Sequence, residues 1–352
     1  MPSLRIIARL AAWWDGSFRA RDQLTLYPAA VWREHGEWFW QIQGNVHHPV
    51  SRPIGAYLFR RALGFTGLTL SPLERLRWQQ RSAPFLAYHQ AKRVLHLRLE
   101  RQQFHLAPSS PTGHFGGVFP LPQLGSIQTD PPPDGRSFER TVWVGSRTVG
   151  RELSMVIHSL NGPGMDVITD VDDTIKITGV QDPTEALRNT FLRPFQPVPG
   201  LAARLTHWAA VHRSQMHYVT GSPWQLYGPL TAFTREQGFP IGSWAMPTFR
   251  FNDRESRRRL RQPELHKMTA LRTLLTRAAE RQFVCLGDSG ERDPEIYTAI
   301  AREFPGRIRR IFIRELGGES VDSVRYRTAR AGVSDAEFRL FRSAAELPAL
   351  LW

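Results

Sequence analysis

The pattern of hydrophobic and polar positions changes along this chain of 352 residues. In roughly the first 160 residues, apolar and polar positions alternate with a period of two, as at Leu95, Leu97 and Leu99. Such alternation is typical of strands that are buried on one face. Further strands are predicted at 38–46, 102–107, 117–122, 138–144 and 153–160, with Gly and Pro residues between them.

Two helices are considered in this β-rich segment. Ser71-Pro72-Leu73-Glu74 is a capping box with Pro at the first helical position, which predicts a helix start. Residues 4–14 have apolar positions near helical spacing, which suits either a helix packed on its own domain or one lying at a membrane surface. We expect residues 1–160 to form a mostly β accessory domain, either a sandwich or a small barrel.

A different pattern begins after the Gly- and Pro-containing turn at 161–164. Strand-like and helix-like segments alternate from there to the end of the chain. The predicted strands are 166–170, 215–219, 283–287, 308–313 and 338–341, and the predicted helices are near 199–212, 223–237, 266–280, 292–303 and 343–351. This alternation predicts an α/β domain over 161–352, with a parallel sheet covered on both faces.

Carboxylates follow the first of these strands directly. Val167-Ile168 leads into Asp170, Asp172 and Asp173. Asp170 and Asp172 point to the same side if the strand geometry continues, and like charges so close need a proton or a cation between them. A hard divalent ion with oxygen ligands, typically Mg²⁺, meets that need, although an Asp-rich turn closing a strand has the same residues.

Three further segments follow in order. Thr220 and Gly221 end a strand and suit a phosphate oxygen, because the hydroxyl donates and the glycine allows close approach. Lys267 begins a helical stretch. Asp288 ends another strand, and Asp293 follows five residues later and supplies a further oxygen ligand. Because ligand sites of open α/β sheets lie at the carboxyl ends of strands, we expect these residues to meet.

These four segments resemble the motifs of the haloacid dehalogenase superfamily of phosphotransferases. The sequences Asp-Val-Asp-Asp-Thr-Ile-Lys from 170, Tyr-Val-Thr-Gly-Ser-Pro-Trp from 218 and Gly-Asp-Ser-Gly-Glu-Arg-Asp-Pro from 287 are most similar to the actin-patch-associated phosphatidate phosphatase family and its bacterial relatives. The resemblance covers roughly residues 160–350. It implies a Rossmannoid fold and Mg²⁺-dependent removal of phosphate from phosphatidate, giving diacylglycerol.

The resemblance also implies roles for single residues. Asp170 matches the nucleophile, and Asp172 matches the general acid and base. Thr220, with Gly221, and Lys267 match the phosphate-binding positions. The expected metal ligands are Asp170, Asp172 through its carbonyl, Asp288 and Asp293.

Spacing bears on the substrate. Only 45 residues separate Thr174 from Thr220, and 46 separate Thr220 from Lys267, so neither gap has room for a large cap domain. An open site suits a bulky phosphomonoester, and a phosphorylated lipid is the leading expectation. The alternatives are a phosphatase acting on nucleic-acid ends and a membrane- or protein-binding module with a vestigial phosphatase domain.

Composition adds a few constraints. The net charge of +14 favours an anionic partner such as a lipid surface, and the basic run Arg254–Arg261 adds to it, although a general preference for Arg would give the same charge. No specific nucleic acid is expected. The single cysteine, Cys285, and the lack of an 18-residue apolar stretch predict a cytoplasmic protein, in peripheral contact with an anionic membrane if its charge serves lipid binding.

Only three residues are Lys, at 92, 176 and 267, which suggests that the ammonium of Lys267 is specifically required.

Overall fold

The computed structural model describes residues 18, 20–49, 52–99, 102–121, 137–146, 149–249, 263–333 and 338–351. The chain forms two compact units. Unit 1 comprises Met1–Ser51, Leu86–Pro132 and Ser137–Ser159, and unit 2 comprises Arg52–Phe85, Pro133–Arg136 and Leu160–Trp352. The apolar stretch at 4–14 and the basic run at 254–261 lie outside the described residues.

Unit 1 is built on one nine-stranded sheet. Its strands are β1 (Gln23–Leu26), β2 (Ala29–Glu34), β3 (Glu37–His48), β4 (Tyr88–His89), β5 (His96–Leu99), β6 (Gln102–His105), β7 (His114–Leu121), β8 (Ser137–Gly145) and β9 (Gly150–Ser159). The strands predicted by alternation are present. Strands β1, β2 and β4 were not predicted, because they are short and lack a clear period of two.

The long strand β3 organises this sheet. Its residues 37–41 pair with β2 and its residues 44–47 pair with β1, while β7 pairs along its other edge. The sheet therefore branches at β3. Its apolar face encloses a core that includes Trp40, Ile42, Leu97 and Val142, all fully buried.

A helical hairpin, residues 52–85, interrupts the strands of unit 1 but belongs to unit 2. Its helices are α2 (Pro53–Ala62) and α3 (Pro72–Leu86). The predicted capping box is present at α3, where Glu74 accepts the backbone N–H of Ser71 at 2.8 Å and donates its own N–H to the Ser71 hydroxyl. Helix α2 was not predicted, since it begins at Arg52 without a side-chain cap.

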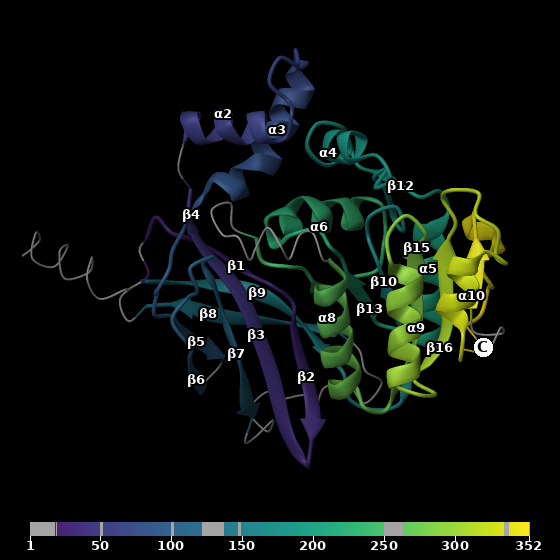
Figure 1. Ribbon diagram of the computed structural model, residues 1–352. Helices are drawn as coiled ribbons and strands as arrows, with labels where there is room; N and C mark the ends of the chain where they lie inside the picture. The colour runs from purple at the N-terminus through teal and green to yellow at the C-terminus, as the bar shows by residue number, and fades with distance from the viewer. Residues whose placement is uncertain are drawn as a thin grey trace, which may run out of the picture. The chain divides into compact units, whose positions relative to one another are not determined.

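The rest of unit 2 is built on a six-stranded parallel sheet, shown in Figure 1. The strands are β10 (Gly164–Thr169), β13 (Met216–Val219), β14 (Gly242–Ala245), β15 (Arg281–Asp288), β16 (Ile308–Arg314) and β17 (Phe338–Phe341). Their order in the sheet is β14-β13-β10-β15-β16-β17. After β10, the chain adds β13 and β14 on one side of it. It then adds β15, β16 and β17 on the other side. Beside this sheet, β11 (Lys176–Ile177) and β12 (Gln196–Pro197) form a small antiparallel pair.

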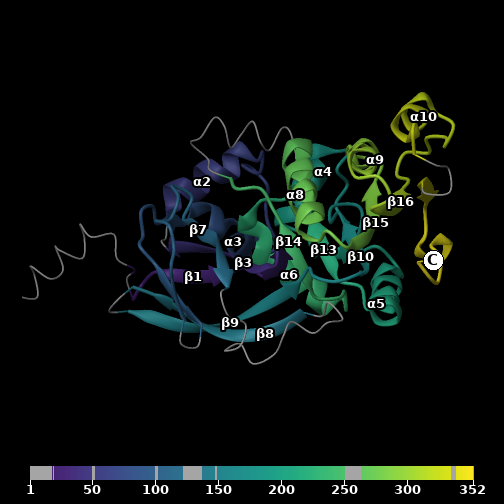
Figure 2. The same cartoon turned by 90° about the horizontal axis from the view of Figure 1, so that it is seen from below.

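Helices cover both faces of this sheet. Figure 2 shows α5 and α6 on one side and α8 and α9 on the other. The helices are α4 (Pro183–Phe191), α5 (Leu201–His212), α6 (Tyr227–Glu236), α8 (Pro263–Arg277), α9 (Asp293–Glu303) and α10 (Val324–Arg330), with short 3-10 turns η2 (Trp224–Leu226) and η3 (Ala344–Glu346). The prediction of an α/β unit with a parallel sheet is confirmed.

The predicted helix at 343–351 is wrong. The chain forms only the turn η3 there, and it becomes extended at Leu347. Leu347 precedes Pro348, and the residue before a proline is disfavoured in the helical conformation. Strand β14 and helices α4 and α10 were not predicted, since each has fewer than ten residues. Among the described residues, no helix has the length and apolar character needed to cross a membrane.

Candidate active site

The candidate site lies where the strand order reverses, between β10 and β15. Asp170 follows the last residue of β10, and its N–H donates to the carbonyl of Leu286 in β15 at 2.9 Å. Asp288 is the last residue of β15. The carboxyl ends of adjacent parallel strands thus bring the two carboxylates together, as expected for a doubly wound sheet.

Asp170, Asp288 and Asp293 form an acidic cluster. Each offers one carboxylate oxygen, and these oxygens lie within 4.8 Å of one another. All three side chains are fully buried. Oxygens that share one Mg²⁺ or Ca²⁺ lie at most about 4 to 5 Å apart, so the spacing is close to what a single hard cation requires.

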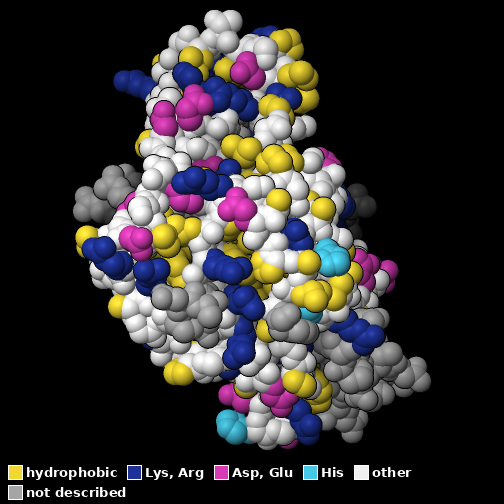
Figure 3. All heavy atoms as spheres, turned by 90° about the vertical axis from the view of Figure 1, so that its right-hand side faces the viewer, with side chains coloured by type: hydrophobic (Ala, Val, Ile, Leu, Met, Phe, Trp, Pro, Cys, Tyr) yellow, Lys and Arg dark blue, Asp and Glu magenta, His cyan; other side chains and the backbone are white. Residues whose placement is uncertain are grey.

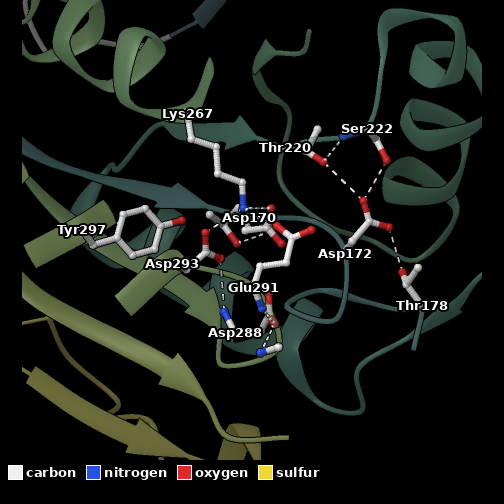
Figure 4. A network of polar contacts seen from close by, with 12 residues as sticks. Asp170, Asp172, Thr178, Thr220, Ser222, Lys267, Asp288, Glu291, Asp293 and Tyr297 are labelled. Atoms are coloured by element: carbon white, nitrogen blue, oxygen red, sulfur yellow. Dashed lines mark hydrogen bonds and ion pairs between the residues drawn. The ribbon is translucent and has the colours of Figure 1, made fainter. Parts of the chain in front are cut away.

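Lys267 on α8 reaches into this cluster, as Figure 4 shows. Its Nζ lies 2.8 Å from Asp170 Oδ1, 2.6 Å from Asp293 Oδ1 and 2.9 Å from Glu291 Oε2. Burial alone would lower the pKa of Lys267, but Asp170, Asp293 and Glu291 together raise it well above its usual value. The ammonium is therefore charged at neutral pH.

One ammonium does not neutralise the carboxylates around it. Burial raises the pKa values of Asp170 and Asp288 well above the usual range, and repulsion from the neighbouring acids adds to the effect against the opposing charge of Lys267. Neither Asp170 Oδ2 nor Asp288 Oδ2 has a hydrogen-bond partner among the described residues. Buried carboxylates without partners are costly, so the donor set fits a divalent cation.

The backbone around Asp288 leaves no room for larger residues. Asp288 Oδ1 accepts the N–H groups of Gly290 and Glu291, and Asp293 Oδ2 accepts the N–H of Asp288. A Cβ atom on Gly287 would lie 2.5 Å from side-chain atoms of Asp293. Glycine is therefore required at Gly287, because any side chain would push Asp293 out of the cluster.

Asp172 takes part in a different set of contacts, separate from the acidic cluster in Figure 4. Its Oδ1 lies 2.7 Å from Lys176 Nζ and accepts the Thr178 hydroxyl at 2.8 Å, while its Oδ2 accepts the Ser222 hydroxyl at 2.8 Å. Burial would raise the pKa of Asp172, but the charge of Lys176 and these hydrogen bonds bring it to about 2. Asp172 is thus an ionised carboxylate in this arrangement.

Asp173 shapes the loop that presents these groups. It has a left-handed backbone, with φ of 55°, which is unfavourable for a residue other than glycine. Its carboxylate accepts the N–H groups of Thr178, Gly179 and Val180 at 2.6–2.9 Å. These three hydrogen bonds offset the strain and hold the loop between β10 and α4 in one conformation.

Thr220 and Gly221 follow β13. The Thr220 N–H donates to the carbonyl of Ala245, and its hydroxyl accepts the N–H of Ser222 at 3.0 Å and donates to Asp172 Oδ2 at 3.3 Å. Thr220 is therefore fully buried beside Asp172, while Gly221 is partly exposed. A phosphoryl oxygen would have to compete with Asp172 for the Thr220 hydroxyl.

The structure therefore brings Asp170, Lys267, Asp288 and Asp293 into direct contact and places Thr220 beside Asp172. The analysis of the sequence did not identify four residues that contact them: Lys176, Thr178, Ser222 and Glu291. The scarcity of lysine could have pointed to Lys176, since two of the three lysines of the chain, Lys176 and Lys267, lie in the site. No sequence signal distinguishes Thr178 from other hydroxyl residues.

Comparison with known proteins agrees with this site. Residues 165–315 match the family described as "Phosphatidate phosphatase APP1, catalytic domain". The matched segment includes all of the contacting residues above.

Two yeast proteins are similar to part of the chain. An uncharacterized protein of Schizosaccharomyces pombe is 30% identical over 178 residues, which are 49% of this chain and 28% of that protein. "Phosphatidate phosphatase APP1" of Saccharomyces cerevisiae is 30% identical over 154 residues, which are 43% of this chain and 26% of that protein. The aligned part thus spans about a quarter of each relative. A solved carbohydrate esterase aligns at 9% identity over 86% of this chain and 91% of its own, with a TM-score of 0.22, which is too low to support an argument.

Proposed function

Residues 165–315 of this chain belong to the APP1 catalytic-domain family, and on that premise we propose that the chain is a phosphoric monoester hydrolase that acts on phosphatidate. The observation that carries the proposal is the contact of Lys267 with Asp170 inside the acidic cluster. A buried nucleophile, a charge-neutralising lysine and a set of metal ligands are the parts that phosphoryl transfer through a covalent intermediate requires.

Asp170 is the proposed nucleophile. Its carboxylate attacks phosphorus in line, so that a bond forms between the carboxylate and phosphorus while the bond from phosphorus to the ester oxygen breaks. The products of this step are an aspartyl-phosphate and an alcohol, which for phosphatidate is diacylglycerol. Water then hydrolyses the acyl phosphate, which releases inorganic phosphate and regenerates the Asp170 carboxylate.

Asp172 is the proposed acid and base. In the first step it gives a proton to the leaving alkoxide, and in the second it takes a proton from the attacking water. With a pKa of about 2, Asp172 is a carboxylate at neutral pH, and the carboxylate is the form that the second step needs. A phosphate dianion bound next to it would raise that pKa by repulsion, so the substrate itself would promote the protonation that the first step needs.

Asp170, Asp288 and Asp293 are the proposed ligands of Mg²⁺, together with the backbone carbonyl of Asp172. Two unpartnered carboxylate oxygens in a cluster with excess negative charge support a divalent cation at this point. When bound, Mg²⁺ neutralises charge on the phosphoryl oxygens and orients the phosphate toward Asp170.

Lys267 and Thr220, with the backbone at Gly221, are proposed to hold the phosphoryl group. Lys267 is charged and within 2.8 Å of the nucleophile, so it lies where negative charge develops during transfer. Fixed charges and donors of this kind stabilise the transition state because they need no rearrangement during the reaction.

The proposed substrate is bulky. Between Asp172 and β13 the chain forms only the short pair β11–β12 and the helices α4 and α5. Such a short insertion, together with the sheet order around β10, supports a haloacid dehalogenase-like fold without a large cap. The described residues of this segment contain no large insertion, which favours a bulky substrate such as a lipid headgroup over a small one enclosed by a cap.

Release of inorganic phosphate tests the function. The full-length protein with Mg²⁺ is expected to release phosphate from p-nitrophenyl phosphate and, faster, from phosphatidate in mixed micelles, and Asp170→Asn is expected to abolish both activities. Asp322→Asn is the matched control. The Asp322 side chain is 74% exposed and lies in the segment between β16 and α10. Equal rates for wild type and Asp170→Asn would refute the proposal.

The same assay separates the two alternatives. A vestigial domain would release no phosphate from any ester. A phosphatase acting on nucleic-acid ends would prefer a 5′- or 3′-phosphorylated oligonucleotide over phosphatidate, and its binding would weaken steeply with salt.

A further inference from the structure

The helical hairpin of unit 2, residues 52–85, exposes a hydrophobic surface. Ile54, Tyr57 and Leu58 lie at positions i, i+3 and i+4 of α2, so they share one face, and they are 78%, 58% and 55% exposed. On α3, Leu73 and Leu76 are 62% and 48% exposed. Single exposed hydrophobic residues are ordinary, but three on one face of one helix indicate a surface that binds something.

The opposite face of α2 is a normal packed face. Phe59 is buried against Trp78 and Phe85 of α3 and against Phe191 of α4, with ring centroids 5.3–5.6 Å apart. The hairpin core is therefore complete without Ile54, Tyr57 and Leu58. Packing inside the hairpin therefore does not require these three side chains, and it does not explain why they are apolar.

The charge of the hairpin is strongly positive. Residues 52–85 contain six arginines and a single acidic residue, Glu74, which is engaged in the capping box with Ser71. Arg61 on α2 and Arg75 on α3 are exposed. At the top of the view in Figure 3, where the hairpin lies, Lys and Arg side chains lie next to hydrophobic ones, with Asp and Glu side chains also present.

A basic helix with one apolar face is suited to the interface of an anionic bilayer. The apolar side chains enter the boundary between headgroups and acyl chains, and the arginines extend to the phosphates. An apolar protein partner would bury Ile54, Tyr57 and Leu58 equally well. The exposed arginines Arg61 and Arg75, in a hairpin with a single acidic residue, favour an anionic surface.

The hairpin is attached to the C-terminal end of α4 and to the segment that follows it. Arg81 of α3 is buried, and its Nη1 donates to the carbonyls of Thr190 and Arg193 at 2.8 and 2.7 Å, at the C-terminal end of α4. Its guanidinium also lies 3.6 Å from the ring centre of Phe195, and the same ring lies 5.0 Å from Lys176 Nζ, the partner of Asp172. Docking of the hairpin on a bilayer would therefore also position the segment 190–195, whose Phe195 lies next to Lys176.

We propose that the α2–α3 hairpin is the membrane-docking surface of unit 2, and that it binds bilayers containing anionic lipid through Ile54, Tyr57 and Leu58 with Arg61 and Arg75. This inference deepens the proposed function, since it explains how a protein without a membrane-spanning helix among its described residues would reach a lipid substrate.

Vesicle co-sedimentation of the full-length protein tests the proposal. Wild type is expected to bind phosphatidylcholine vesicles that contain phosphatidate. The double variant Ile54→Glu/Leu58→Glu is expected to bind about tenfold more weakly or worse, because it places carboxylates at the apolar boundary. Arg61→Gln and Arg75→Gln are each expected to weaken binding about fivefold, and only to the anionic vesicles.

Ile241→Glu is the matched control. Ile241 is 70% exposed and belongs to the same unit, but it precedes β14 at the amino end of the parallel sheet. It adds a negative charge to the unit away from the hairpin and is expected to leave vesicle binding unchanged. An equal loss of binding in Ile241→Glu would overturn the proposal, as would wild-type binding by the double variant.

Two further readouts separate this inference from the proposed function. The double variant is expected to hydrolyse p-nitrophenyl phosphate within about twofold of wild type, because the hairpin surface is outside the site, while its rate on vesicle-bound phosphatidate falls with binding. If wild type hydrolyses no ester but binds vesicles through the hairpin, the docking surface stands and the phosphatase falls. If the double variant dissociates a wild-type dimer and still binds vesicles, the surface binds a second copy instead and the proposal falls.

Discussion

Lys267 Nζ lies 2.8 Å from Asp170 Oδ1, and both side chains are almost completely buried. The two residues are far apart in the sequence, on α8 and directly after β10. Their contact places one ammonium among several carboxylates, and the cluster keeps an excess of negative charge that a divalent cation could offset. The first prediction concerns this pair.

Lys267→Met is expected to lower kcat/KM for p-nitrophenyl phosphate by a factor of about 10² to 10³, since it removes a charge at the position where we propose that the phosphoryl group binds. It also leaves Asp170 and Asp293 without their ion pair, which is expected to lower the free energy of unfolding by about 3 to 5 kcal/mol. Steady-state kinetics and urea unfolding measure the two effects.

Arg272→Met is the control on the same helix. Arg272 pairs with Glu303, but both side chains are substantially exposed, so the change is expected to cost less than about 1 kcal/mol and to leave kcat/KM unchanged. A Lys267→Met enzyme with wild-type kcat/KM would remove Lys267 from the proposed mechanism.

Removal of divalent cations is expected to lower the thermal midpoint of the wild-type protein, and addition of Mg²⁺ to raise it. A ligand at 100 times its Kd stabilises a fold by about 2.7 kcal/mol. Asp288→Asn reduces the repulsion in the acidic cluster, so it is expected to stabilise the metal-free protein and to reduce the shift that Mg²⁺ produces. Differential scanning fluorimetry with EDTA and with Mg²⁺ provides the comparison.

Asp322→Asn, on the exposed surface, serves as the control and is expected to keep the full Mg²⁺ response. The metal assignment fails if the midpoint of wild type is the same in EDTA and in saturating Mg²⁺.

Lys176→Met is expected to raise the pKa of Asp172. Burial already favours the protonated form of this carboxyl, and Lys176 supplies the largest opposing effect, so removal of the ammonium shifts the pKa upward from about 2. In the pH dependence of kcat/KM, the limb governed by Asp172 is expected to move to higher pH.

Ser222→Ala is expected to move that limb in the same direction by a smaller amount, because it removes one hydrogen bond and no charge. Lys92→Met changes an exposed lysine of unit 1 and is expected to leave the profile in place. A profile that is identical in wild type and Lys176→Met would show that Asp172 does not titrate in the rate-determining step.

Asp166 makes folding of unit 2 sensitive to acid. It is fully buried at the amino end of β10, where Arg281 Nη2 and the N–H of Gln215 donate to Oδ1 at 2.7 and 2.9 Å, and His217 Nε2 lies 3.4 Å from Oδ2. Burial would raise the pKa of Asp166, but the hydrogen bonds and charges of His217 and Arg281 lower it below the usual value of 3.8.

The sign of the pH effect follows from that lowered pKa. The unfolded chain binds a proton on Asp166 more readily than the folded one, so the stability it contributes is fully present above the unfolded pKa and is lost as the pH falls through the folded pKa. Urea unfolding between pH 7 and pH 3 is expected to show this loss in wild type and a weaker dependence in Asp166→Asn.

Arg281→Met is expected to lower the free energy of unfolding at neutral pH by about 3 to 5 kcal/mol, because Asp166 would remain buried without its guanidinium partner. The pair of Arg292 and Glu264, which is exposed at Arg292 and partly exposed at Glu264, offers the comparison, and Arg292→Met is expected to cost little. Similar unfolding energies for the two variants would contradict a structural role for the Asp166–Arg281 pair.

Much of unit 2 was predictable from local pattern. Five of its six parallel strands were expected near their observed positions, because each is a short apolar run bounded by polar or turn residues. Strand β14 was not, since Gly242–Ala245 is short and begins with glycine. The hairpin residue Arg81 was also beyond the sequence, because its partners are carbonyl groups more than a hundred positions away.

By itself, the sequence determined which strands end in carboxylates and therefore which residues, Asp170 and Asp288 among them, could meet at one edge of a parallel sheet. That much is local, since hydrophobic periodicity encodes the strand and the polar residue that ends it. Only the tertiary structure decided that Asp172 faces Lys176 instead of the acidic cluster, and that Glu291 joins Lys267. Those contacts depend on the direction of side chains in folded loops, which hydrogen bonds such as those of Asp173 determine and which no periodic pattern records.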